Sequence, residues 1–500
     1  QGRRTCIRNK ICKAILVDIT MKSSLVYLYG VQFYSVIITI LATPLLIELL
    51  GTEGYGLIGL YFVIQMLLQV VDGGFSGSIT KLTAELDLSN STNVSKFYRS
   101  YQYFQRLLNK AVLVILPLSG ILFFSDAASS IIESTLAAAT IDTSVLLMIS
   151  CVAIRFLSLS ERGLLQGLER QKTLALINFT IVTLRYPVAV GMLVLFSNDV
   201  VHFFCFQLLV VLVEVGILKY FGLKFLKSAK IFSRTKERDI DKDLNLGWLF
   251  EQAGGLWSIS VLWVLVSQLD KLVLSFSVPL DAYGIFSLAL VGANMMLTMF
   301  IPINQVLMPR FVKLFNRSDS RSFAGMVLTT IQFYVCFFSV VASCLYVFGE
   351  ELLFLWTRNA ELSEDASSFL GYLAIGNFIH GVTNIAFIAT YASGDLGAYA
   401  KRYRNHVAVV LPISIYSAIT YKEYGVISVW VFGAFVFFLY TTIPILKKIF
   451  EFRVALMSLA SALLQILATA GAMFIFKFQF VLSASQSLEH LAYLIGLVVF

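Results

Sequence analysis

The sequence predicts an all-α integral membrane protein with about 14 transmembrane helices. Two observations support this prediction: apolar stretches of about 20 residues fill most of the chain, and the links between them alternate between basic and acidic. The composition agrees, because 58% of the 500 residues are hydrophobic and only 14% are charged. That leaves too little polar surface to cover a soluble globule, so the chain belongs in lipid.

The apolar stretches place the spans, with edges that hydropathy fixes only to within several residues. The last span is shorter than a full membrane crossing. In chain order the predicted spans are residues 25–47, 55–79, 110–125, 143–160, 173–196, 200–221, 249–277, 283–306, 324–348, 367–393, 404–420, 425–446, 455–476 and 488–500.

The charges of the links predict the orientation. The segment before the first span is rich in lysine and arginine, and every second link repeats this basic sign, as in 219–242 and 310–321. The links between them are acidic, as around Glu350 and Glu364. By the positive-inside rule both termini are cytoplasmic, and we expect a multi-pass protein of the bacterial cytoplasmic (inner) membrane. Met21, directly before the first span, is a candidate start of the chain.

The charge and the chemistry-bearing residues exclude several classes of protein. The net charge of +8 is spread over separate loops, so it indicates orientation and no nucleic-acid partner. The sequence shows no Ser-His-Asp cluster, no paired metal ligands and no phosphate loop, and it contains only four histidines. We therefore predict no catalytic residues, no metal and no cofactor, and a protein that is not an enzyme.

A short motif recurs in the two halves of the chain. Residues 53–57 (Glu-Gly-Tyr-Gly-Leu) open the second span, and residues 281–285 (Asp-Ala-Tyr-Gly-Ile) open the eighth in the same direction. A polar stripe follows each copy on one helix face. The stripes comprise Gln65, Gln69, Asp72 and Ser76 in the first copy and Asn294, Thr298 and Gln305 in the second.

The repeat predicts two parallel six-helix lobes related by a pseudo-two-fold axis along the membrane normal. The predicted domains are a basic cytoplasmic segment (1–24), the N-lobe (25–221), a basic cytoplasmic loop (222–248), the C-lobe (249–446) and two extra C-terminal helices (447–500).

Two arginines inside predicted spans are candidate pathway residues, because a lipid-facing charge at the bilayer centre costs at least about 2.5 kcal/mol. Arg185 lies in the middle of the fifth span before Pro187, whose missing N–H should kink the helix. Arg185 either lines a cavity or forms an ion pair with Glu214 in the sixth span. Arg155 either lines the cavity or extends to the cytoplasmic interface.

Further polar residues complete the candidate set. Asp270 and Lys271 are adjacent and point about 100° apart, so we expect them not to neutralise each other. Asp72 precedes two glycines and has a gating or a packing role. Asn377, His380 and Asn384 form a third polar face, on which His380 is either a proton relay or a packed core residue.

The sequence resembles the Wzx-type O-antigen and capsular-repeat flippases, which form the polysaccharide transport branch of the MOP (MATE-like) flippase superfamily. The segments that resemble the family are Pro44 to Gly56 with Val71 to Gly74, and Gln268 to Gly284. The resemblance implies two lobes around a central cavity and alternating access. It also implies transfer of an undecaprenyl-pyrophosphate-linked oligosaccharide from the cytoplasmic to the outer leaflet for surface polysaccharide.

By position, the resemblance assigns Arg155 and Arg185 to the pyrophosphate, which a guanidinium can bind bidentately. The substrate and membrane lipids are the expected partners, with other polysaccharide assembly proteins as further candidates. Coupling to H⁺ or Na⁺ through Asp72 or Asp270 remains open. Two alternative functions are a cation-coupled multidrug antiporter of the same superfamily and a membrane glycan polymerase or ligase.

Overall fold

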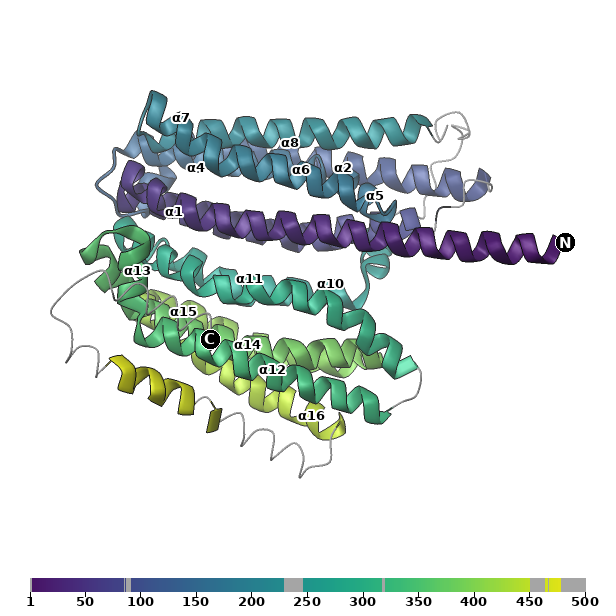
Figure 1. Ribbon diagram of the computed structural model, residues 1–500. Coiled ribbons are helices and arrows are strands. Elements are labelled where there is room, and N and C mark those ends of the chain that lie inside the picture. The colour runs from purple at the N-terminus through teal and green to yellow at the C-terminus, as the bar shows by residue number, and fades with distance from the viewer. Residues whose placement is uncertain are drawn as a thin grey trace. The chain divides into compact units, whose positions relative to one another are not determined.

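The computed structural model describes residues 2–84, 86, 91–228, 246–316, 320–449, 464–465 and 467–477. These residues form helices and no strand (Figure 1). Nine helices in the described ranges are long and apolar enough to cross a membrane. The chain divides into two compact units, Gln1–Val264 and Leu265–Phe500. The prediction of an all-α membrane protein is confirmed.

The first unit contains the helices of the first six predicted spans. They are α1 (Gly2–Ala84), α2 (Ser91–Phe124), α3 (Ala127–Ile131), α4 (Ala138–Phe156), α5 (Leu159–Gly167), α6 (Gln171–Thr183), the π-helical turn η1 (Leu184–Val188), α7 (Ala189–Phe196) and α8 (Val200–Ser228). The first two predicted spans both lie in α1, which is interrupted at Gly51 with φ 74°. Only glycine adopts this left-handed conformation readily, so Gly51 separates the two spans.

Two helix ends differ from the predicted span edges. α2 begins at Ser91, well before residue 110, because its first turns carry basic and polar residues that hydropathy excludes from a span. α8 continues to Ser228, so the first residues of the predicted 222–248 loop are helical. Both helices extend beyond their apolar stretch on the side where the sequence is basic.

A pair of glycines brings α5 against α1. A Cβ atom on Gly163 would lie 2.5 Å from the carbonyl oxygen of Ser76, and one on Gly167 would lie 2.5 Å from that of Thr80. The Thr80 hydroxyl also donates to the carbonyl of Gly163 at 3.1 Å. Small residues four apart allow this close backbone approach in membrane helices. The glycine pair therefore fixes the position of α5.

We expect the Gly163→Ala variant to be destabilised by about 1–3 kcal/mol, because the new methyl group would overlap the backbone of α1. Thermal unfolding of the purified protein in detergent measures the effect. Gly191→Ala is the matched control, since no atom lies within 4 Å of the position where its Cβ would stand. Equal unfolding midpoints for the two variants would contradict the close contact.

The second unit contains the remaining described helices. They are α10 (Leu246–Leu274), which begins in the first unit, then α11 (Leu280–Asn316), α12 (Ser320–Val347), α13 (Gly349–Thr357), α14 (Ala360–Ser393), α15 (Leu396–Phe437), the π-helical turn η2 (Phe438–Thr442) and α16 (Ile443–Ile449). α15 holds both predicted spans 404–420 and 425–446 and is interrupted between them at Lys422, with φ 54°. The core of this unit is aromatic, with Phe300, Tyr334 and Phe338 packed ring against ring.

The last two predicted spans are only partly covered. Residues 467–477 form an apolar helix in the thirteenth span, and the fourteenth lies outside the described residues. The count of about 14 helices and the domain boundaries therefore stay predictions.

The tyrosines of the repeated motif, Tyr55 and Tyr283, are both fully buried. The acidic residues differ: Glu53 accepts hydrogen bonds from residues 134–136, whereas Asp281 is exposed.

Candidate functional site

Three arginines meet one glutamate in the first unit. Arg155 lies near the end of α4, Arg162 on α5 and Arg185 in the π-helical turn η1. All three guanidinium groups contact the carboxylate of Glu214 on α8. We call these four residues the arginine cluster.

The contacts differ in geometry. Nη2 of Arg162 lies 2.7 Å from Oε1 of Glu214. Arg155 approaches Oε2 with both Nη2 at 3.1 Å and Nε at 3.3 Å, and Arg185 reaches the same oxygen with Nη2 at 3.4 Å. Oε2 therefore receives donors from two arginines. Each guanidinium carries five N–H groups, so all three retain donors that Glu214 does not use.

Two glutamine side chains hold the arginines in place. Nη1 of Arg155 donates to Oε1 of Gln65 on α1 at 2.9 Å. Nε2 of Gln207 on α8 donates to the backbone carbonyl of Arg185 at 2.9 Å. The predicted distortion at Pro187 is present as the π-helical turn, in which ordinary i→i−4 bonding is interrupted. Gln207 thus stabilises the segment that carries Arg185.

The cluster carries more positive than negative charge in a largely buried place. The exposed fractions of the side chains are 14% for Arg155, 16% for Arg185, 27% for Arg162 and 6% for Glu214. Three cations and one anion leave two positive charges in excess. In addition, Nε of Arg185 is buried and has no hydrogen-bond partner. Because unpaired buried charge is costly, this arrangement favours an anionic ligand.

The cluster shows the contacts of the two arginines for which the sequence left alternatives open, and a cavity-lining role for them stays a prediction. Arg185 forms the ion pair with Glu214 that was one of its two alternatives. The guanidinium of Arg155 binds Gln65 and Glu214, and its two alternatives stay predictions. Arg162 was missed, because its position in a basic link was read only as an orientation signal. The Gly163–Gly167 pair beside it is the sequence signal that could have placed α5 against α1.

Other predicted residues are placed less fully. Gln69 and Asp72 lie on α1 in the segment 68–75, whose side chains are outside the described set. In the part of the chain that is described, no group of three or more His, Cys, Asp or Glu residues could hold a metal ion. The roles predicted for Gln69 and Asp72 therefore stay predictions.

The second unit brings three predicted polar residues to one tryptophan, Trp430 on α15. Asn377 on α14 accepts a hydrogen bond from Nε1 of Trp430 at 3.1 Å and donates to Oδ1 of Asn294 on α11 at 3.2 Å. The ring of His380 lies 4.4 Å from the ring of Trp430, and Nζ of Lys271 lies 4.8 Å from it. The polar faces of α11 and α14 thus meet through Asn294 and Asn377.

The prediction that Asp270 and Lys271 do not neutralise each other is wrong. Nζ of Lys271 lies 3.2 Å from Oδ1 of Asp270 and also donates to the carbonyl of Ser267 at 2.7 Å. Both side chains are buried. The Cβ atoms diverge as expected on a helix, but the four-carbon stem of lysine is long and flexible enough to bend back. The pair is therefore internally compensated.

Glu161 is a buried carboxyl next to Arg162 in the chain. Its carboxylate accepts hydrogen bonds from Nε2 of Gln105 at 2.6 Å, the hydroxyl of Tyr101 at 3.2 Å and the hydroxyl of Ser160 at 2.9 Å. Burial raises the pKa of Glu161 above its ordinary value of 4.5, against the opposing effect of these hydrogen bonds. The folded protein therefore holds this proton more tightly than the unfolded chain does.

We expect this shift to lower stability as the pH rises from 4.5 toward the raised pKa, because the unfolded chain releases the proton first. A Glu161→Gln variant has no proton to release at this position, so this pH-dependent part of its free energy of unfolding is absent. Its unfolding midpoint should therefore fall less than that of the wild type between about pH 5 and about pH 8. Thermal unfolding in detergent at the two pH values measures the difference. Parallel pH profiles would contradict a raised pKa at Glu161.

Comparisons with solved structures place the fold. Lipid II flippase MurJ in an inward closed conformation has a TM-score of 0.65 at 14% identity, and the alignment covers 95% of this chain and 96% of that one. An inward-facing multidrug resistance MATE family transporter of the MOP superfamily has a TM-score of 0.61 at 13% identity, covering 85% and 99%. A MOP superfamily transporter from Pyrococcus furiosus has a TM-score of 0.55 at 15% identity, covering 85% and 96%.

The fold is therefore shared with these MOP superfamily transporters. No curated protein matches the sequence. The family model described as polysaccharide biosynthesis protein matches residues 21–315, more than half of the chain. The chain belongs to this family, which confirms the resemblance to the Wzx-type flippases that the sequence shows, and it is a membrane flippase rather than an enzyme.

Proposed function

We propose that the protein moves an undecaprenyl-pyrophosphate-linked oligosaccharide repeat unit from the cytoplasmic to the outer leaflet of the bacterial inner membrane. Both termini lie in the cytoplasm in this proposal. The repeat units supply surface polysaccharide such as O-antigen, capsule or exopolysaccharide. The membership of the polysaccharide biosynthesis family supports the class of substrate.

The observation that carries the proposal is the charge of the arginine cluster. Arg155, Arg162 and Arg185 leave two positive charges beyond what Glu214 neutralises. A pyrophosphate that links a lipid to a sugar carries one negative charge on each of its two phosphoryl groups. The two charges balance the excess, and guanidinium groups bind phosphoryl oxygens through paired N–H donors.

Glu214 has a role of its own in this mechanism. Without substrate, its carboxylate is the counterion that allows three arginines to remain in a low-dielectric environment. When the pyrophosphate binds, its oxygens accept hydrogen bonds from guanidinium N–H groups that Glu214 does not use, including the unpartnered Nε of Arg185. Release in the outward-facing state then returns the arginines to Glu214 alone, so the site does not hold its product.

The remaining predicted residues have supporting roles in the proposal. Gln65, Gln69, Asn294, Asn377 and His380 provide hydrogen-bonding groups for the sugars along the pathway. An inside-negative potential favours outward movement of the anionic head by about 2.3 kcal/mol per charge per 100 mV. Coupling to H⁺ or Na⁺ through Asp72, or through gating at the Asp270–Lys271 pair, stays a prediction.

The test is deletion of the gene from its host, followed by measurement of surface polysaccharide and of the cytoplasmic-leaflet pool of lipid-linked repeat units. A flippase predicts loss of surface polymer together with accumulation of repeat units inside. Single unpolymerised repeats appearing outside would indicate a polymerase instead. Unchanged surface polymer and an unchanged pool would overturn the proposed substrate.

A further inference from the structure

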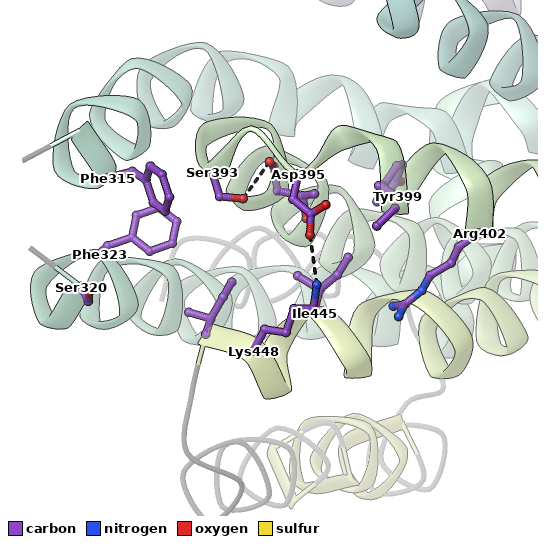
Figure 2. A pocket seen from close by; sticks show the side chains of 12 residues that line it. Phe315, Ser320, Phe323, Ser393, Asp395, Tyr399, Arg402, Ile445 and Lys448 are labelled. Atoms are coloured by element: carbon purple, nitrogen blue, oxygen red, sulfur yellow. Dashed lines mark hydrogen bonds and ion pairs between the residues drawn. The ribbon is translucent and has the colours of Figure 1, made fainter. Parts of the chain in front are cut away.

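A cavity of about 490 Å³ lies in the second unit, away from the polar group around Trp430. It is formed where α11, α12, α14, α15 and α16 end or begin, so it lies at one end of the helices (Figure 2). The nearby helix ends are basic, with Arg310 and Lys313 on α11, Arg321 on α12, and Lys401, Arg402 and Arg404 on α15. Cavities of this size hold small ligands or lipid head groups.

The polar side of the cavity has an excess of positive charge. It is lined by Arg402 on α15, Lys448 on α16 and Asp395 in the turn before α15. Nζ of Lys448 lies 3.0 Å from Oδ2 of Asp395, and both side chains are about half exposed or more. Figure 2 marks this ion pair with a dashed line. Arg402 has no ion-pair or hydrogen-bond partner among the described residues. One guanidinium is therefore available to a ligand.

Backbone and hydroxyl groups on the same side add further donors. Asp395 is the N-cap residue of α15, but its side chain does not cap the helix. The first N–H groups of α15 consequently lack the cap that this side chain could supply. α12 also begins at this cavity, with Ser320 in its lining. The positive ends of two helices favour an anion, and phosphate is the anion that helix N-termini commonly bind.

Part of the cavity lining is apolar. It comprises Phe315, Phe323, Ile445 and Ile449, and the rings of Phe315 and Phe323, which lie away from Arg402 in Figure 2, pack edge to face with centroids 5.6 Å apart. Phe315 is 43% exposed although it is large and hydrophobic. A free phosphate would leave this apolar side uncovered. A phospholipid would cover it with an acyl chain while its head group faced Arg402 and Lys448.

We propose that this cavity binds the phosphate of an anionic phospholipid, with Arg402 and Lys448 contacting the head group and the phenylalanines contacting an acyl chain. Basic pockets between helices at the membrane surface bind anionic head groups in this way. The site is separate from the arginine cluster, and it does not depend on which substrate the protein moves. The group that the cavity would recognise is a phosphate, and a soluble phosphate compound carries the same group as the lipid.

The test is native mass spectrometry of the full-length protein in an uncharged detergent, titrated separately with phosphatidylglycerol, phosphatidylcholine and inorganic phosphate. We expect the protein to retain phosphatidylglycerol at least about tenfold more tightly than phosphatidylcholine, since a charge-assisted hydrogen bond has about this effect. Arg402→Gln should remove most of the preference, and Lys448→Gln part of it. Size-exclusion profiles check that the variants remain folded.

Arg404→Gln is the matched control, because Arg404 is exposed on the same helix and does not line the cavity. It should retain phosphatidylglycerol as the wild type does. The protein could instead bind inorganic phosphate, lose that binding in Arg402→Gln and show no preference for phosphatidylglycerol over phosphatidylcholine. That result would overturn the lipid proposal and assign the cavity to a soluble phosphate compound. Equal retention of both lipids, or unchanged retention in Arg402→Gln, would overturn the proposal.

Discussion

The Arg185→Ala variant is expected to abolish transport while the protein still inserts and folds. Arg185 supplies one of three guanidinium groups of the arginine cluster, and the loss of its charge-assisted contact weakens binding of the phosphate at least about tenfold. Folding should persist because Glu214 keeps its contacts to Arg155 at 3.1 Å and Arg162 at 2.7 Å. Arg185→Lys should restore activity only in part, since lysine has the charge without the planar fork.

The measurement is complementation of a deletion strain by each variant, with surface polysaccharide quantified against the amount of variant protein in the membrane fraction. Arg170→Ala is the control, because Arg170 is exposed in the turn between α5 and α6 and contacts neither Glu214 nor Gln65. It should complement fully. Full complementation by Arg185→Ala would remove the pyrophosphate assignment of the arginine cluster.

The Glu214→Gln variant is expected to lose about 3–5 kcal/mol of stability, the usual cost of leaving a buried charge without its partner. Three arginines would then share a site without an anion, because the contacts of all three converge on this one carboxylate. Thermal unfolding of the purified protein in detergent measures the loss. Added pyrophosphate should raise the midpoint of the variant more than that of the wild type, since it replaces the missing negative charge.

Asp199→Asn provides the control for this experiment. Asp199 also pairs with a neighbouring side chain, that of His202, but the aspartate side chain is 45% exposed, so its loss should change stability little. If Glu214→Gln unfolds at the same temperature as Asp199→Asn, the arginines do not depend on Glu214 for their charge balance. The role proposed for Glu214 as the resting counterion would then be wrong.

Much of the fold could be predicted from the sequence because lipid leaves the backbone few choices. Every spanning segment must satisfy its own hydrogen bonds, so an apolar stretch of the right length becomes a helix. Hydropathy did not predict the helix bounds where a helix continues beyond its apolar stretch, as at the start of α2 and the end of α8. There the residues are polar and basic, and nothing in their hydropathy distinguishes a helix from a loop.

The site was only partly predictable. Arg155 and Arg185 stand out because charges are rare within apolar stretches, and Glu214 stood out for the same reason. Arg162 lies just outside a span, where a basic residue is ordinary, and its place depends on the contact of α5 with α1. The Asp270–Lys271 pair was misjudged because helix geometry gives the direction of Cβ, not the path of a long side chain.

The π-helical turn at Leu184–Val188 contains one residue more than the same turn of an α-helix would need. Each residue turns an α-helix by about 100°, but a π-helical turn takes up its extra residue within nearly the same rotation. The faces of α6 and α7 therefore keep the relation that they would have in an α-helix one residue shorter. A chain with one residue deleted there would keep these faces, but it would lose the wide turn from which the Arg185 side chain contacts Glu214 and its carbonyl contacts Gln207. A one-residue gap in an alignment of this family belongs inside this turn, because a gap elsewhere in the span would pair residues from different helix faces.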